Sequence, residues 1–429
     1  MQRLNPMREA PKPGPLDELL APCEKMADTG IPVGIVNDLM LRVLFNEGDV
    51  SLGRFREVIR LPSAVLDEQI KWMQKEHLVE IAKAGGLGRV SFVYSLTDAG
   101  RGRARDAFER SQYVGPAPVP LEKYRRAIAL QARRDQISAA QMEQALSHLV
   151  LPSDFHRRIG PAVNSGNSLF IYGLPGNGKT SIARAIAGLI SGSDPVWLPY
   201  AITTAGQIIQ VQDPLVHKPV GAAHSEELDE RWARVHRPTV MVGGELTMES
   251  LDLRYDPIAK FYEAPLQLKA NGGMFLIDDF GRQQVPAADL LNRWIVPLEM
   301  GIDILRLRTG QTLEVPFRQM IVFSTNLDPN ELVDEAFLRR IQMKVEVGSP
   351  DERMFYQIFV NSCQQMKIPF HKESFLYFLQ EWYRKTNREF QAVHARDVLR
   401  TVAALCQYDG SPSHLTPQLV DEACRSYFV

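Results

Sequence analysis

The spacing of apolar positions changes along the 429-residue chain, and each change predicts a different kind of element. Residues 31–112 show three segments of helical spacing, then two alternating segments around a glycine turn, which predicts three helices and two strands. From Leu169 to about Val347, short apolar runs alternate with helical segments, as in a parallel sheet covered by helices. Beyond residue 350 only helical spacing remains. The sequence therefore predicts an α/β core between an α+β domain and an all-helical domain.

Prolines and polar residues divide these regions. The segment 113–124, YVGPAPVPLEKY, alternates prolines with small residues and predicts an extended linker. Ser138 and Gln141 form a capping-box pattern that predicts a helix leading into the core. The predicted parts are a disordered or extended tail, residues 1–30; a front domain, 31–112; the linker, 113–124; the α/β core, 125–349; and a helical domain, 350–429.

One segment carries specific chemistry: SLFIYGLPGNGKTSIARAIAGLI, from Ser168 to Ile190. A buried strand, a glycine-rich turn and an amphipathic helix expose backbone N–H groups to phosphate oxygens at a helix N-terminus. Lys179 is expected to reach the terminal phosphates and the Thr180 hydroxyl to bind magnesium. The predicted ATP-binding residues are Gly173, Pro175, Gly176, Asn177, Gly178, Lys179, Thr180 and Ser181.

Two further apolar runs end in polar residues. GGMFLIDDF predicts a central strand that ends at Asp278 and Asp279, beside the glycine-rich loop. Asp278 is expected to hold Mg²⁺ with Thr180, and Asp279 to orient the attacking water. RQMIVFSTNL predicts another strand that ends at Ser324, Thr325 and Asn326, a trio that by itself fits a simple turn.

This order of motifs, followed by DEAFLRRI and HARDVLR, resembles the AAA+ ATPase superfamily over residues 125–429. The resemblance implies that Asn326 helps to place the water and that Arg396 is the arginine of a helical lid. It also implies that Arg340, with Arg339 as the alternative, is supplied to the site of a neighbouring subunit. A guanidinium there would stabilise charge on the transferred phosphoryl group. The sequence departs from the usual pattern at Asp279, where glutamate is more common, which leaves its water-orienting role open.

The region between the helix after the glycine-rich loop and the strand that ends in the two aspartates is longer than a minimal α/β core requires. Turns at TTAG and VGGE predict added hairpins, and residues 302–319 predict a third around RTGQ. The last is similar in position to the pre-sensor hairpin of the branch containing enhancer-binding activators, MoxR-type ATPases and replicative helicases, in which such hairpins point into a ring's pore. Arg306 and Arg308 would contact an acidic polymer there, or merely keep the hairpin soluble.

The front domain resembles a winged helix, with YSLTDAG similar to the closing strand of small bacterial regulators. Its third helix carries acidic and basic residues together, namely Asp67, Glu68, Lys71, Lys75 and Glu76. Arginines 54, 56, 60 and 89 can still form a basic stripe. DNA binding through residues 31–112 and docking of a protein client therefore both remain open.

Composition sets the remaining limits. The 49 Lys and Arg residues balance 51 Asp and Glu residues, so no global field marks a nucleic-acid or membrane binder. The four cysteines have no paired spacing, and neither a signal peptide nor a membrane-length apolar run is present, which favours a reducing, cytoplasmic compartment.

Taken with the resemblance, these features predict an ATP hydrolase that uses Mg²⁺ and assembles into a homo-oligomeric ring, expected as a hexamer, to remodel an unknown protein client. The alternative is a DNA-binding regulator or switch with slow hydrolysis. A scaffold that binds ATP without turnover fits less well, because the lysine, hydroxyl, carboxylates and arginines are all present.

Overall fold

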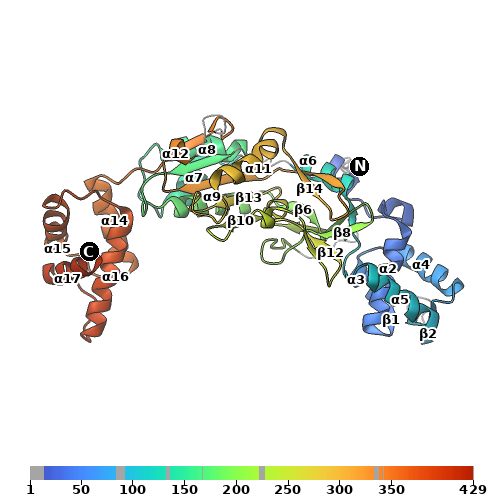
Figure 1. Ribbon diagram of the computed structural model, residues 1–429. Helices are drawn as coiled ribbons and strands as arrows, with labels where there is room; N and C mark the ends of the chain where they lie inside the picture. Colours follow the sequence, from blue (N-terminus) through green and yellow to red (C-terminus); the bar gives the residue numbers. More distant parts are fainter. Residues whose placement is uncertain are drawn as a thin grey trace, which may run out of the picture.

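The computed structural model describes residues 14–83, 92–131, 136–166, 168–221, 228–332, 338–341 and 343–428. The molecule is elongated (Figure 1), with the front domain at one end and the C-terminal helices at the other. The parallel sheet and a second, smaller β-sheet lie between them. An α/β core with a helical domain after it agrees with the predicted fold class.

The central sheet has five parallel strands in the order β10-β13-β16-β5-β17. Their bounds are β5 Leu169–Tyr172, β10 Thr239–Val242, β13 Met274–Ile277, β16 Met320–Thr325 and β17 Met343–Glu346. Strand β16 therefore separates the strand before the glycine-rich loop from the strand before the two aspartates. The register pairs Thr325 with Tyr172 and Phe323 with Ile277, so the carboxyl ends of these three strands lie close together.

Alternate residues of the central strands enter two separate apolar cores. Leu169, Ile171 and Val322 pack on one face with α7, α8 and α9, whereas Phe170, Phe275 and Phe323 pack on the other with Trp294 of α11. The helix bounds are α7 Ala139–Leu146, α8 Phe155–Ser165, α9 Lys179–Ser191, α10 Leu266–Lys269, α11 Ala287–Met300, α12 Pro329–Leu332 and η3 Glu249–Leu251. The period of two along each strand thus gives one sheet two helical layers. The capping box of Ser138 and Gln141 is formed at the start of α7, as predicted.

A smaller β-unit is built mainly from strands between α9 and β13, and it is completed by the earlier β4 and α6 and the later β14 and β15. It contains a five-stranded sheet in the order β11-β12-β8-β7-β4 and two strand pairs, β6-β9 and β14-β15. The bounds are β4 Val119–Pro120, α6 Leu121–Leu130, β6 Val196–Pro199, β7 Ala201–Thr204, β8 Gln207–Gln210, β9 Trp232–Val235, β11 Arg254–Asp256, β12 Phe261–Glu263, β14 Ile302–Arg306 and β15 Thr312–Pro316. These elements share one apolar core, which includes Trp232 and Tyr262.

Two of the three predicted hairpins are present. Strands β7 and β8 pair around TTAG, and β14 pairs with β15 around RTGQ. The third prediction is wrong, because the strand before VGGE is β10, which pairs in parallel with β13 at the edge of the central sheet. A short alternating strand looks the same in either pairing, so the turn residues alone misled the prediction.

The front domain contains the three predicted helices α2, α3 and α4, a further helix α5 that the sequence did not predict, and an antiparallel sheet of three strands where two were predicted. Its elements are α2 Val33–Glu47, β1 Val50–Ser51, α3 Leu52–Ile59, α4 Ser63–Lys75, β2 Val79–Lys83, β3 Val93–Leu96 and α5 Asp98–Arg110. The predicted glycine turn between the last two strands falls on residues 84–91, outside the described residues.

The predicted tail and linker are more ordered than the sequence indicated. Within residues 14–30 the chain forms α1 (Pro15–Leu19) and η1 (Met26–Thr29) and buries Leu20 and Met26. In the 113–124 segment, Val119 is fully buried and pairs with Ile202 of the β-unit. The prolines keep the segment extended up to Pro120, but extended backbone here forms strand β4 and then α6, so it is not a loose linker.

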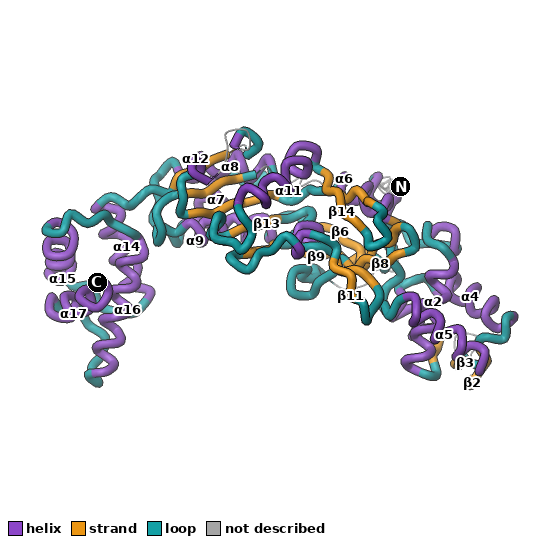
Figure 2. Tube along the Cα trace, in the orientation of Figure 1, coloured by secondary structure: helices purple, strands orange, loops and turns teal. Residues whose placement is uncertain are grey.

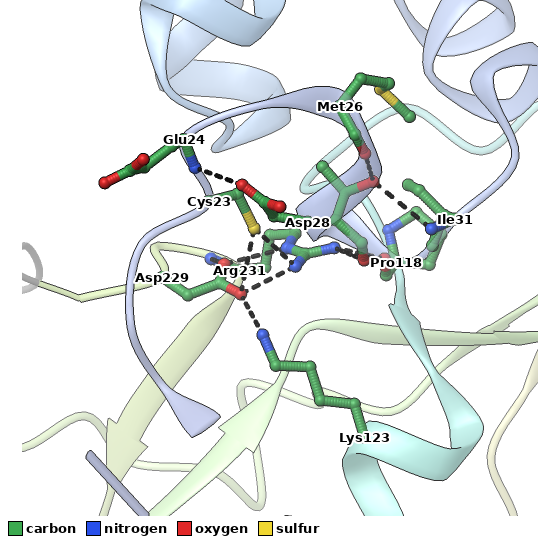
Figure 3. A network of polar contacts seen from close by, with 10 residues as sticks. Cys23, Glu24, Met26, Asp28, Ile31, Pro118, Lys123, Asp229 and Arg231 are labelled. Atoms are coloured by element: carbon green, nitrogen blue, oxygen red, sulfur yellow. Dashed lines mark hydrogen bonds and ion pairs between the residues drawn. The ribbon is translucent and has the colours of Figure 1, made fainter. Parts of the chain in front are cut away.

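A buried polar network ties the tail and linker to the β-unit (Figure 3). Arg231 has no exposed side-chain surface, and its Nε and Nη2 donate to Asp229 at 2.9 and 2.8 Å. Its Nη1 donates to the carbonyl oxygens of Thr29 and Pro118 at 3.0 and 3.2 Å, and Nη2 also contacts Cys23 Sγ at 3.2 Å. Lys123 donates to the same carboxylate at 2.9 Å. The pKa of Asp229 is lowered: burial alone would raise it, but Arg231 and Lys123 outweigh that cost.

The C-terminal region is entirely helical in its regular elements (Figure 2). It contains α14 Glu352–Gln365, α15 Lys372–Leu379, the π-helical turn η4 Gln380–Arg384, α16 Ala392–Tyr408 and α17 Pro417–Tyr427, packed around Phe355 and Phe378. Among the described residues, no helix has the length and apolar character needed to cross a bilayer.

Candidate functional site

The glycine-rich loop joins β5 to α9 at the carboxyl edge of the central sheet. Gly173 has φ 134°, and a Cβ there would lie 2.3 Å from the Val347 carbonyl oxygen, so only glycine fits. Lys179 Nζ folds back to donate to the carbonyl oxygens of Gly173 and Leu174, both at 2.8 Å. Burial lowers the pKa of this ammonium, while Asp279 and Asp278 act in the opposite direction. The lysine therefore lies inside the loop, within the field of both carboxylates.

The hydroxyl and the first carboxylate meet as the sequence predicted. Thr180 Oγ1, in the first turn of α9, donates to Asp278 Oδ1 at 3.1 Å. Both are oxygen ligands of the kind that Mg²⁺ prefers, and Mg²⁺ keeps several waters when one or two protein groups bind it. The donor set thus fits a magnesium ion held by Thr180 and Asp278 with phosphate oxygens and water. A bound Mg²⁺ would neutralise charge on the phosphates.

The second carboxylate is held in an uncommon backbone conformation. Asp279 has φ 51°, a region that non-glycine residues rarely adopt and that is enriched at functional sites. Its Oδ1 accepts a hydrogen bond from Asn326 Nδ2 at 3.1 Å, so β13 and β16 bring the two side chains together. The sequence did not single out Gln283, whose Nε2 donates to the carbonyl oxygens of Asp278 and Asp279 at 3.1 Å. The sequence signal that could have identified Gln283 is its position shortly after the two aspartates.

The arginines near residue 340 lie at the opposite edge of the sheet. The Arg340 carbonyl accepts from Ser168 Oγ at 3.3 Å, at the amino end of β5, whereas the glycine-rich loop follows the carboxyl end of that strand. Arg340 Nε donates to Glu299 of α11 at 2.5 Å, a partner that sequence reasoning missed. Arg339 is exposed. The structure therefore separates this pair from the loop of its own chain; residues 333–337 of the predicted motif fall outside the described residues.

The C-terminal helices reach the loop through the first turn of α16. The Val393 N–H donates to the Gly176 carbonyl oxygen at 2.9 Å, and the Ala392 N–H donates to Asn177 Oδ1 at 3.1 Å. Arg396 follows one turn later, half exposed, with its Nε 3.2 Å from Asp397 Oδ1. The arginine predicted for the lid thus lies on the helix that begins against the glycine-rich loop.

A cavity of about 260 Å³ adjoins the loop between the core and the C-terminal helices. Its apolar walls come from Leu151 and Phe155 on one side and from Met354 and Ile358 on the other. Asn177 also lines it, 6% exposed, and its Nδ2 has no hydrogen-bond partner among the described residues. Besides these apolar side chains the lining includes Arg158 and Glu346, and a cavity of this mixed character beside a phosphate loop suits a planar heterocyclic base.

The basic residues proposed for polymer contacts are mostly engaged. Arg308 lies over the Tyr255 ring, 4.7 Å from its centroid, while Arg306 is exposed on the β14-β15 hairpin. In the front domain, Arg54 pairs with Glu47 and Glu57, and Arg56 pairs with Glu230. Arg60 lies over the Tyr200 ring at 5.0 Å. Arg89, the fourth residue of the predicted stripe, falls outside the described residues.

Comparisons with known proteins add little beyond this geometry. A family model described as a domain of unknown function, DUF8689, matches residues 351–426, the helical C-terminal region. No curated protein matches the sequence. Among solved structures, the chain is similar to NtrX from Brucella abortus in complex with ADP, at 14% identity and a TM-score of 0.39, covering 75% of this chain and 60% of that one.

The same NtrX in complex with ATP matches at 15% identity and a TM-score of 0.39, covering 75% of this chain and 62% of that one. A single-residue mutant of RuvB from Thermotoga maritima matches at 10% identity and a TM-score of 0.37, covering 69% of this chain and 72% of that one. The chain thus spans less than two thirds of the length of these NtrX chains.

Proposed function

We propose that the chain is an AAA+ ATPase that binds Mg-ATP at the glycine-rich loop and hydrolyses it. The observation that carries the proposal is the meeting of Lys179, Thr180, Asp278, Asp279 and Asn326 at one edge of the sheet, from three separate strands. Loop N–H groups and Lys179 bind phosphate oxygens, and Asp279 with Asn326 orients the attacking water. The 260 Å³ cavity takes the base.

In this proposal, the active site is completed by a neighbouring subunit of a ring-shaped oligomer. Arg340 lies beside the amino end of β5, too far from the loop of its own chain to reach it, so it acts on the nucleotide of a neighbour in a ring, with Arg339 as the alternative residue. A head-to-tail contact of this kind closes into a ring if its rotation permits. We expect six subunits, Arg396 to act from the lid, and ATP turnover to remodel a protein client in a cytoplasmic setting.

The front domain, of winged-helix type, selects the client. In the predicted stripe, Arg54 and Arg56 are paired with carboxylates and Arg60 lies over an aromatic ring, which reduces the uncompensated positive charge that this stripe offers to phosphates. Protein docking is therefore favoured over the DNA-binding alternative. Stimulation of ATP turnover distinguishes the two: a protein client stimulates it in the first case, and duplex DNA in the second.

Nucleotide titration and steady-state hydrolysis test the ATPase itself. Lys179→Ala should abolish ATP binding, because it removes the charged phosphate contact and no apolar core group. Asp279→Asn should still bind ATP but hydrolyse it slowly, because the amide keeps the size and loses the charge that orients water. Unchanged affinity in the first variant, or parental turnover in the second, would contradict the assignment.

A further inference from the structure

The first turn of α16 is capped by the glycine-rich loop rather than by its own sequence. The N-cap residue Gln391 makes no side-chain hydrogen bond to this helix. The first N–H groups of a helix lack partners within it, and they are normally satisfied by a local side chain. Here the Ala392 N–H donates to Asn177 Oδ1, and the Val393 N–H donates to the Gly176 carbonyl oxygen. Asn177 and Ala392 are 215 residues apart in the sequence.

The contact is close as well as polar. A Cβ added to Gly176 would lie 2.4 Å from Val393 Cγ1, so the helix packs directly on the loop backbone. Asn177 is 6% exposed, and because its Oδ1 faces the Ala392 N–H, its Nδ2 is left as a buried donor at the wall of the 260 Å³ cavity. One buried side chain therefore bonds the lid helix and also belongs to the lining of the nucleotide cavity, and its Nδ2 has no hydrogen-bond partner among the described residues.

We propose that Asn177 is a positioning residue that couples occupancy of the nucleotide site to the position of the C-terminal lid. This rests on the proposed ATPase function. A bound nucleotide supplies an acceptor to Nδ2 and takes the Lys179 donors now used by the Gly173 and Leu174 carbonyls. The loop backbone adjusts, α16 follows because the loop caps it, and Arg396, one turn along α16, is placed against the phosphates.

The lid side of the bond can be removed without altering the loop. Proline has no N–H and is favoured at the first position of a helix, so Ala392→Pro deletes the donor to Asn177 and keeps α16. The preceding Gln391 already has φ −130° and ψ 135°, which suits a residue before proline. Ala392→Ser is the matched control, because it keeps the N–H.

Steady-state kinetics of the full chain give the first test. Ala392→Pro should lower kcat about tenfold relative to Ala392→Ser, with a much smaller difference in KM, because both variants change the same side chain and only the proline removes the N–H. Asn177→Leu removes the same bond from the other side, so the double variant Ala392→Pro/Asn177→Leu should be no slower than Asn177→Leu alone. Equal kcat in the proline and serine variants, or losses that multiply in the double variant, would overturn the proposal.

Hydrogen exchange in the full chain separates this proposal from the ATPase assignment. Without nucleotide, the amide of Ala392 should exchange faster in Asn177→Leu than in the parent, and with a slowly hydrolysed ATP analogue the parent should gain protection over the first turn of α16. Unchanged exchange in Asn177→Leu refutes the coupling even if ATP is hydrolysed. The opposite result is also informative. If the Ala392 amide exchanges faster in Asn177→Leu than in the parent without nucleotide, but the parent binds no ATP, the proposed function is refuted instead.

Discussion

Arg340→Ala gives the sharpest test of an active site shared between subunits. The Arg340 backbone lies beside Ser168, and the loop carbonyl that Lys179 contacts belongs to Gly173. Five residues of extended strand at ~3.3 Å each separate these points by roughly 16 Å, which exceeds the reach of an arginine side chain. The guanidinium therefore cannot serve its own nucleotide. If it serves a neighbour's, its loss should slow hydrolysis by about 10³ to 10⁵ with little effect on ATP binding.

Mixing two inactive variants measures this directly. Arg340→Ala subunits keep a complete loop, and Lys179→Ala subunits keep Arg340, so sites with both parts form only where the two kinds are neighbours. With random exchange, about a quarter of all sites are complete in an equal mixture, and activity should peak there. Arg339→Ala is the control for a change in charge at the adjacent residue, and it should retain turnover if Arg340 is the acting residue.

A flat, inactive profile across mixing ratios, despite demonstrated subunit exchange, would refute the shared site. The alanine variant keeps the backbone bond to Ser168 and removes the ion pair with Glu299, which lies at a partly exposed site. Because an exposed pair of this kind contributes about 0–1 kcal/mol, loss of folding would be a weak explanation for such a profile.

Two further predictions concern stability. Burial, followed by the charge of Arg388, lowers the pKa of His394 to about 4. Below about pH 6.5 the unfolded chain therefore binds a proton at this histidine that the folded chain does not bind. The melting temperature should fall as the pH is lowered from 6.5 towards 4, and it should fall less steeply in His394→Gln. Asp229→Asn should cost about 3–5 kcal/mol in denaturant unfolding because Arg231 is left buried and uncompensated, whereas the exposed control Glu122→Gln should change stability by less than about 0.5 kcal/mol. A flat pH profile for the parent, or equal midpoints for the two carboxylate variants, would contradict these assignments.

The candidate site was predictable where each residue lies next to the element that positions it. Lys179 and Thr180 begin the helix after the loop, and Asp278 and Asn326 directly follow buried strands. Parallel strands bring their carboxyl ends to one edge, so these short-range patterns were sufficient to place the side chains together. The bonds from Thr180 to Asp278 and from Asn326 to Asp279 agree with that expectation.

Contacts between distant segments were not predictable in this way. The Asn177–Ala392 bond and the Glu299–Arg340 pair depend on how separate elements pack, which no local spacing encodes. VGGE was misassigned because a four-residue strand with alternating burial suits both a hairpin and the edge of a parallel sheet. The prediction of a linker over the proline-rich segment 113–124 was incomplete for a related reason. Composition indicates extended backbone, but pairing with β7 decides whether that backbone is a linker or part of a sheet.

The packed linker changes how movement at the nucleotide site can reach the front domain. Strand β16 ends at Thr325, directly before Asn326, and it follows β15 in the sequence. Leu313 and Val315 of β15 lie in the same apolar core as Trp232. Trp232 adjoins Arg231, whose guanidinium holds Thr29 and Pro118 and so fixes both chain segments that enter and leave the front domain. A flexible tether would absorb a shift of β16, whereas this attachment is buried and closely packed, so we expect the front domain to move together with the β-unit.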